Sequence, residues 1–144
     1  MNGKIGKIQA LALFSLPFFF LCSCTSDLHY NAKTGNIAGI QKIIDSGTPI
    51  EKTDQLGNTP LIVAVSSNKP ETVDYLCKKG ANINAQNNGR STALITAAYH
   101  NLIDVAKVLV KYNPDKTIKD KYGNTALDYA EQYKYTEIIS LLKK

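Results

Sequence analysis

The stretch Asn58-Thr59-Pro60-Leu61 decides the fold of this chain, because it returns along the sequence at a fixed interval. Its threonine and its leucine recur twice more at the same spacing, and a serine and a leucine stand one interval before them. Such agreement in four registers indicates an internal repeat, which is the strongest signal in the sequence. The matching positions are Ser26, Thr59, Thr92 and Thr125, followed by Leu28, Leu61, Leu94 and Leu127.

One repeat is predicted to consist of two short antiparallel helices. Thr59 is placed to cap a helix that starts at Pro60, where the missing N–H of proline is tolerated. A second helix is predicted from about Pro70 to Gly80, because glycine favours the left-handed conformation in which helices end. Glycine or asparagine recurs at this place as Gly47 and Asn113. The apolar stripe of the second helix comprises Val73, Leu76, Cys77 and their counterparts one interval away.

Between the predicted helix pairs lie three segments rich in Asn, Asp and Gly, which supply the backbone angles of tight loops. We expect them to project as hairpin-like fingers. Arg90 stands where the other two segments carry glycine, so the hydrogen bonding of that single turn is expected to differ. The segments are Asp54-Gln55-Leu56-Gly57-Asn58, Asn87-Asn88-Gly89-Arg90-Ser91 and Asp120-Lys121-Tyr122-Gly123-Asn124.

A period of about 33 residues with a Thr-Pro-Leu opening resembles the ankyrin repeat, from about residue 25 to residue 144. The resemblance implies an all-α solenoid of four stacked helix-turn-helix repeats with hairpin-like fingers. It also implies that Ser26 and His29 cap the first helix together, as threonine and histidine do in the family. The repeats are predicted at about residues 25–57, 58–90, 91–123 and 124–144. The resemblance rests on Gly57-Asn58-Thr59-Pro60-Leu61, Gly80-Ala81-Asn82-Ile83-Asn84, Ser91-Thr92-Ala93-Leu94 and Gly123-Asn124-Thr125-Ala126-Leu127.

The first residues differ in composition from the repeats. Lys4 and Lys7 precede an apolar run, residues 8–21, which is shorter than the roughly 20 residues that a membrane-spanning helix needs. This pattern predicts a signal peptide, residues 1–23, ahead of a repeat domain at residues 24–144. Ordinary signal cleavage without lipidation and a retained membrane anchor are the alternatives.

Leu21-Cys22-Ser23-Cys24 resembles a bacterial lipobox, with a leucine three places before the final cysteine and a small residue directly before it. The resemblance implies cleavage ahead of Cys24, lipidation of Cys24 and attachment to a membrane on the periplasmic side of the bacterial cell envelope. Cys22 fits less well as the modified residue, because bulky side chains precede it. Cys77 lies in the apolar stripe and is expected to be a buried packing residue.

Little in the composition points to chemistry. The 144 residues, 44% hydrophobic and 20% charged, fit one modest domain. The net charge of +5 is scattered along the chain and does not form the basic stripe of a nucleic-acid-binding protein. The two histidines lack the Cys or Asp spacing of a zinc site, and no glycine-rich phosphate loop follows a strand. We therefore expect no metal, cofactor, small-molecule substrate or catalytic residue.

The remaining candidates lie on the surface that an ankyrin stack uses for binding. Tyrosine is concentrated along the first helices of three of the four repeats, and it offers a large contact area at a low entropic cost. Tyr30 and Tyr129 are expected to be half-buried and structural. The predicted partner-binding residues, on the first helices and at the finger tips, are Gln55, Leu56, Ser66, Ser67, Asn88, Arg90, Tyr99, His100, Lys121, Tyr122, Gln132 and Tyr133.

These features favour a lipid-anchored, monomeric module that binds an unidentified protein through its concave groove and finger tips. Two biological roles are compatible with this hypothesis: immunity to a toxin, and support of a periplasmic stress-defence enzyme. The sequence does not choose between them. A structural envelope lipoprotein without a dedicated partner is the alternative.

Overall fold

The computed structural model describes residues 27–144, and these residues form eight short helices without any strand. The predicted signal peptide, Ser26 and the lipidation site Cys24 lie outside the described residues. The helices are α1 (Leu28–Thr34), α2 (Ile37–Asp45), α3 (Pro60–Ser66), α4 (Pro70–Lys78), α5 (Ala93–Tyr99), α6 (Ile103–Val110), α7 (Ala126–Gln132) and α8 (Thr136–Leu142).

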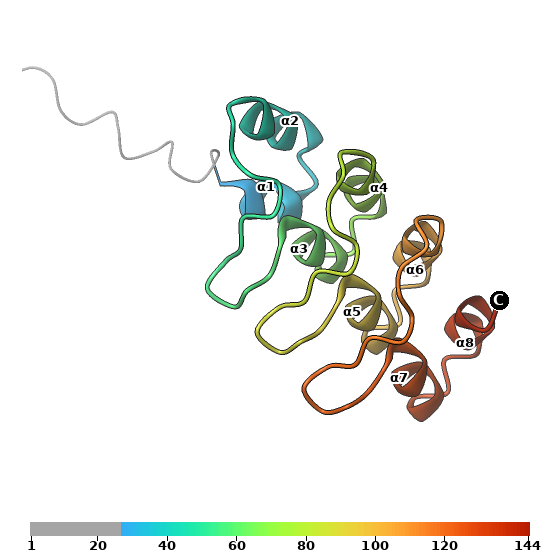
Figure 1. Cartoon of the computed structure of the whole chain (residues 1–144). Coiled ribbons are helices and arrows are strands. Elements are labelled where there is room, and N and C mark those ends of the chain that lie inside the picture. Colours follow the sequence, from blue (N-terminus) through green and yellow to red (C-terminus); the bar gives the residue numbers. More distant parts are fainter. Residues whose placement is uncertain (1–26) are drawn as a thin grey trace, which may run out of the picture.

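The helices stack in two rows, and three loops project to one side as fingers (Figure 1). In the first row α1 packs on α3, α3 on α5 and α5 on α7, whereas in the second row α4 packs on α6 and α6 on α8. Each repeat supplies one helix to each row, since α1 packs on α2, α3 on α4, α5 on α6 and α7 on α8. The predicted all-α solenoid of four helix pairs is confirmed.

The helices of the first row begin in the way that the repeated threonine predicts. Thr59, Thr92 and Thr125 each accept a hydrogen bond from the backbone amide three residues later, at 3.2–3.3 Å. In the first repeat the expected cap is corrected: the side chain of Asp27 caps α1 by accepting from the amide of His29 at 2.9 Å. The His29 ring instead contacts the carbonyl of Asn58 at 3.0 Å, and this contact joins the first two repeats.

Left-handed residues end both helices of a repeat. The predicted positions after the second helix are confirmed, because Gly47, Gly80 and Asn113 all have positive φ. A further left-handed position, which the sequence reading missed, joins the two helices of each repeat. It is occupied by Gly35, Asn68, Asn101 and Lys134.

The repeated leucines lie in the core. Leu28, Leu61 and Leu94 are at most 2% exposed, whereas Leu127 is only half-buried because no described repeat packs on the far side of α7. Cys77, which we expected to be buried, is only half-buried. Burial still raises the pKa of its thiol to about 11, so the thiol is protonated and unreactive near neutral pH.

The first repeat exchanges side-chain volume between two packed positions. The buried Asn31 occupies the place that is alanine in the other three repeats, and Gly39 occupies the place of Thr72, Val105 and Ile138. A Cβ atom on Gly39 would overlap the side chain of Asn31. The Asn31 amide donates to the carbonyl of Asp27 at 2.8 Å and accepts from Asn36 at 2.7 Å. The larger residue therefore needs the glycine opposite it.

Candidate functional site

The three fingers share one backbone design. In each, the first residue donates from its amide to the carbonyl of the fifth, at 3.0–3.1 Å, and its carbonyl accepts from the fourth, at 2.8–3.1 Å. Arg90 keeps this pattern by adopting a left-handed φ of 56°, as glycine does in the other two fingers. We number them finger 1 (residues 54–58), finger 2 (residues 87–91) and finger 3 (residues 120–124).

Hydrogen bonds connect the fingers to one another. Asn88 of finger 2 donates from its backbone amide to the carbonyl of Leu56 at 3.0 Å, and from its side chain to the carbonyl of Gln55 at 3.2 Å. The amide of Lys121 in finger 3 donates to the carbonyl of Gly89 at 3.0 Å. The predicted binding residue Asn88 is exposed, but its backbone amide and its side-chain amide both donate hydrogen bonds to finger 1. The exposed side chains of the three fingers therefore project from a backbone that hydrogen bonds between neighbouring fingers hold in place.

Asp120 fastens finger 3 to α7. One carboxylate oxygen accepts from the amides of Tyr122 and Asn124, at 2.9 and 3.1 Å, and the other accepts from the Tyr129 hydroxyl at 2.6 Å. Burial of this 6%-exposed residue raises its pKa, but these hydrogen bonds to the charged form outweigh burial and hold the pKa below its ordinary value. The hydrogen bond that the Tyr129 hydroxyl donates to Asp120 raises the pKa of Tyr129.

Five aromatic side chains, at the end of α5 and between the middle of α7 and the start of α8, form what we call the aromatic cluster: Tyr99, His100, Tyr129, Tyr133 and Tyr135. Tyr99 stands edge-on to three neighbours, with ring centroids 5.0 Å from His100, 5.2 Å from Tyr129 and 5.8 Å from Tyr133. Tyr133 in turn stacks on Tyr135 at 5.6 Å. Partial desolvation and the neighbouring Tyr99 hydroxyl raise the pKa of Tyr133. The contacts hold the rings in place, yet Tyr99 and Tyr133 remain 45% and 42% exposed.

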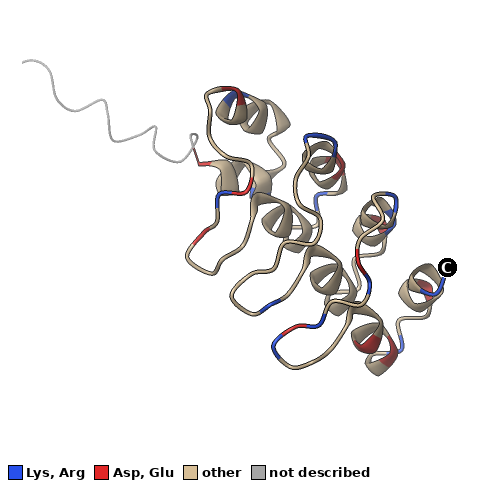
Figure 2. Cartoon of the chain, viewed as in Figure 1, with Lys and Arg blue, Asp and Glu red and all other residues tan. Residues whose placement is uncertain are grey.

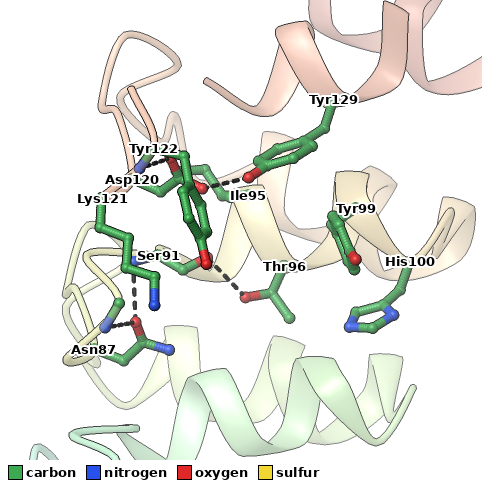
Figure 3. Close-up of a pocket in the computed structure, with 11 residues that line it drawn as sticks. Asn87, Ser91, Ile95, Thr96, Tyr99, His100, Asp120, Lys121, Tyr122 and Tyr129 are labelled. Carbon is green, nitrogen blue, oxygen red and sulfur yellow. Dashed lines mark hydrogen bonds between the residues drawn. The ribbon is translucent and has the colours of Figure 1, made fainter. Parts of the chain in front are cut away.

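A hollow of about 250 Å³ lies between the aromatic cluster, finger 2 and finger 3. Figure 3 shows Tyr99, Tyr122 and Tyr129 reaching it from α5, finger 3 and α7. We call this hollow the tyrosine pocket. It is lined by Asn87, Gly89, Ser91, Ile95, Thr96, Tyr99, His100, Asp120, Lys121, Tyr122 and Tyr129.

The structure brings some of the predicted binding residues together. Tyr99, His100, Lys121 and Tyr122 line the tyrosine pocket, and Tyr133 contacts it through the ring of Tyr99. The other predicted residues do not line it; they are Gln55, Leu56, Ser66, Ser67, Asn88, Arg90 and Gln132.

The positions of the two tyrosines that we expected to be structural need correction. Tyr129 is only 8% exposed and lines the tyrosine pocket, so it is both a packing residue and a wall of the site. Tyr30 is 46% exposed instead of half-buried. Sequence reading also missed Asp120, which pairs with Tyr129. Its recurrence as Asp54 and Asn87 at the repeat interval was the available signal.

Two further observations concern residues 27–144 alone. No cluster of three or more His, Cys, Asp or Glu side chains there is arranged to hold a metal ion. Every helix in this part of the chain is too short or too polar to cross a bilayer.

The geometry defines a class of protein: a stack of helical repeats that offers an extended surface of exposed side chains for binding. A family model described as ankyrin repeats in three copies matches residues 28–120 and 92–144. The chain belongs to the ankyrin repeat family, and its fold is that of a protein–protein interaction module.

The chain spans only a small part of the length of the curated relatives that it matches here. Alpha-latrotoxin-Lg1a of Latrodectus geometricus is 36% identical over 72% of the chain and 8% of its own length. Transient receptor potential cation channel subfamily A member 1 of Homo sapiens is 35% identical over 81% of the chain and 11% of its own length. The B-cell lymphoma 3 protein homolog of Mus musculus is 31% identical over 78% of the chain and 25% of its own length. The similarity therefore covers the repeats and not the whole of these relatives.

Proposed function

We propose that this protein is a membrane-anchored ankyrin-repeat module of the bacterial envelope that binds a protein partner through its third and fourth repeats. The observation that carries the proposal is the aromatic cluster beside the tyrosine pocket. Tyrosine is one of the residue types enriched among those that contribute most of the binding energy at protein interfaces. Tyr122 adds a further ring, 72% exposed, at the tip of finger 3.

Rigidity supports the proposal. The fingers are tied to one another through Asn88 and Lys121, and finger 3 is tied to α7 through Asp120. Side chains held in this way lose little conformational freedom when a partner binds, so more of the contact energy appears as affinity. The mechanism is recognition by a preorganised surface.

The anchor is a separate part of the proposal. The basic start, the short apolar run and the Leu21-Cys22-Ser23-Cys24 motif support lipidation of Cys24 and attachment on the periplasmic side of a membrane. Metabolic labelling with an alkyne-bearing palmitate analogue in a bacterial host tests it. We expect label on the wild type and on Cys22→Ser, and none on Cys24→Ser. Acylation of Cys24→Ser would contradict the proposal.

Photo-crosslinking in intact cells tests the binding function. The crosslinkable amino acid p-benzoylphenylalanine replaces Tyr122 or Tyr133 in separate variants, and Lys42, exposed on α2 in the other row, serves as the control position. We expect one discrete protein adduct from the two tyrosine positions and none from Lys42. Adducts of equal yield at all three positions, or none anywhere, would instead favour a structural envelope lipoprotein without a dedicated partner.

A further inference from the structure

The tyrosine pocket has features that indicate what kind of group it accepts. Its volume of about 250 Å³ lies below the roughly 300–1,000 Å³ typical of small-molecule sites, so it suits one side chain of a larger partner. Ile95, 3% exposed, and the rings of Tyr99 and Tyr122 give it apolar walls.

On the wall formed by finger 2 and α5, several polar groups of the pocket are already engaged within the protein. The Asn87 side chain accepts from the amides of Gly89 and Ser91, at 2.9 and 3.0 Å, and donates to Asn58 at 2.9 Å. The hydroxyls of Ser91 and Thr96 lie 3.4 Å apart and share a hydrogen bond, and Thr96 also donates to a backbone carbonyl. A polar occupant bound against this wall would have to displace these bonds, whereas an uncharged hydrophobic side chain leaves them intact.

The charges around the pocket are unbalanced toward positive. Arg90 is the charged residue of finger 2, and Lys119 and Lys121 flank the acidic Asp120 at finger 3 (Figure 2). Asp120 is buried and accepts three hydrogen bonds. Within residues 27–144, Arg90 and Lys121 take part in no ion pair. These two cations are therefore available to carboxylates of a partner.

Two nearby carboxylates on α7 offset part of this positive charge, but both already have partners within the protein. Asp128 is held in the capping box of Thr125, through bonds of 2.7 Å, and Glu131 pairs with Lys143 at 2.9 Å. A cationic side chain in the pocket is disfavoured as well, because the ammonium of Lys121 already lies 4.9 Å from the centre of the Tyr122 ring.

We infer that the tyrosine pocket takes one uncharged hydrophobic side chain from an acidic segment of the partner protein, whose carboxylates meet Lys121 and Arg90. The inference rests on the proposed function and specifies the chemistry of the partner at that site. Charge complementarity of this kind speeds association and rejects basic competitors.

Peptide binding to the full chain, purified in mild detergent, tests the inference. The probe is a short fluorescein-labelled peptide with one phenylalanine flanked by glutamates. Matched probes replace the phenylalanine with alanine or the glutamates with lysines. Fluorescence anisotropy gives the affinities. We expect the glutamate–phenylalanine peptide to bind at least about tenfold more tightly than either matched probe.

Variants of exposed residues locate the binding. Lys121→Glu should weaken binding of the glutamate–phenylalanine peptide about fivefold to tenfold at low salt, with a smaller loss of affinity at high salt. Tyr122→Ala should weaken it about tenfold. The controls at the approach to finger 1, Lys52→Glu and Thr53→Ala, change exposed residues outside the predicted binding set and should alter the affinity by less than about twofold. Circular dichroism confirms that all four variants keep the wild-type fold.

Several results would overturn the inference: no binding of the glutamate–phenylalanine peptide, equal binding of the lysine or alanine probe, or equal losses in the finger 1 controls. These failures are distinct from failure of the proposed function. If crosslinking still captures one protein through Tyr122 and Tyr133, the module binds a partner but reads a different chemistry. If crosslinking fails as well, the binding function itself is wrong.

Discussion

The first two repeats and the last two present the same backbone to a partner but different side chains. Ser66, Tyr99 and Gln132 occupy one repeated position at the end of the first-row helices, and Ser67, His100 and Tyr133 occupy the next. The second repeat thus offers two hydroxyls where the third offers two rings. The difference teaches that packing fixes only the inward positions of a repeat, and that the outward positions are free to differ for binding.

The clearest way to break this comparison is to ask whether the two halves share one scaffold. Leu61→Ala and Leu94→Ala should each lower the free energy of unfolding by about 2–5 kcal/mol, because both leucines are 1% exposed. Leu127→Ala should cost clearly less, since Leu127 is half-buried. Urea unfolding followed by circular dichroism measures the three values. A loss at Leu127 as large as at Leu94 would show that the terminal repeat is packed like an internal one.

The bond between Asp120 and Tyr129 belongs to the C-terminal half alone, since the matching carboxylate in finger 1, Asp54, binds Asn58 instead. Tyr129→Phe should lower the free energy of unfolding at neutral pH by about 1.5–3 kcal/mol, because a buried carboxylate loses a donor. Tyr99→Phe, which removes an exposed hydroxyl, is the control. An equal loss in both variants would assign the effect to the aromatic cluster and not to Asp120.

This bond also predicts a pH dependence. The folded protein holds the pKa of Asp120 below its ordinary value of 3.8, so the stabilisation is present above that pH and is lost as the pH falls through the depressed pKa. The stability of Tyr129→Phe should therefore change less between neutral and strongly acidic pH than that of the wild type. Thermal unfolding at a series of pH values measures the difference; parallel curves would contradict the assignment.

Binding should separate the two halves of the surface. The double variant Tyr99→Ala/Tyr133→Ala should lower the affinity for the captured partner by about tenfold or more. The double variant Ser66→Ala/Ser67→Ala should change that affinity by less than about twofold. The two double variants change the same two repeated positions, in the second repeat for the serines and in the third and fourth repeats for the tyrosines, so they are matched controls for each other. Surface plasmon resonance with the crosslinked partner, once purified, gives the affinities. A larger loss from the serine variant would move the site to the second repeat.

A smaller effect concerns the fingers. Arg90→Gly should raise the free energy of unfolding by about 1 kcal/mol, because glycine adopts the left-handed φ of 56° without strain. Gly123→Ala should lower it by a similar amount, since its φ is 83° and the space around it is open. Urea unfolding of both variants measures the pair. A destabilised Arg90→Gly would mean that the arginine side chain contributes more than its backbone conformation costs.

Much of the fold could be predicted because it depends on local chemistry that repeats. Threonine capping, glycine at helix ends and inward leucines each act over a short stretch of chain, so the regular period exposes them. The exceptions have physical causes. Asp27 caps α1 because aspartate is as good an N-cap as serine or threonine. Lys134 adopts the left-handed conformation between the helices of its repeat, where the other repeats carry glycine or asparagine, so its residue type gave no signal.

The candidate site was predictable only in part. Tyr99, His100, Lys121 and Tyr122 could be placed on one surface from the period together with the resemblance to ankyrin repeats, and the structure brings them to one pocket. The role of Asp120 could not be derived, because its bond to Tyr129 depends on how finger 3 approaches α7. Fingers 1 and 3 both begin with an aspartate, but the second carboxylate oxygen of Asp54 accepts from Asn58, whereas that of Asp120 accepts from Tyr129.

The exchange of volume between Asn31 and Gly39 limits how this array can be rebuilt. Shuffling whole units should succeed, because each unit carries both members of the pair, whereas splicing within the first unit would combine a bulky residue with a bulky neighbour or leave a void. Single changes at the two sites should thus each be harmful, whereas the double change to alanine and valine removes the overlap with Asn31 and leaves only the Asn36 side chain to move aside. An evolutionary path between this unit and its siblings would have to cross that fitness valley or change both codons together.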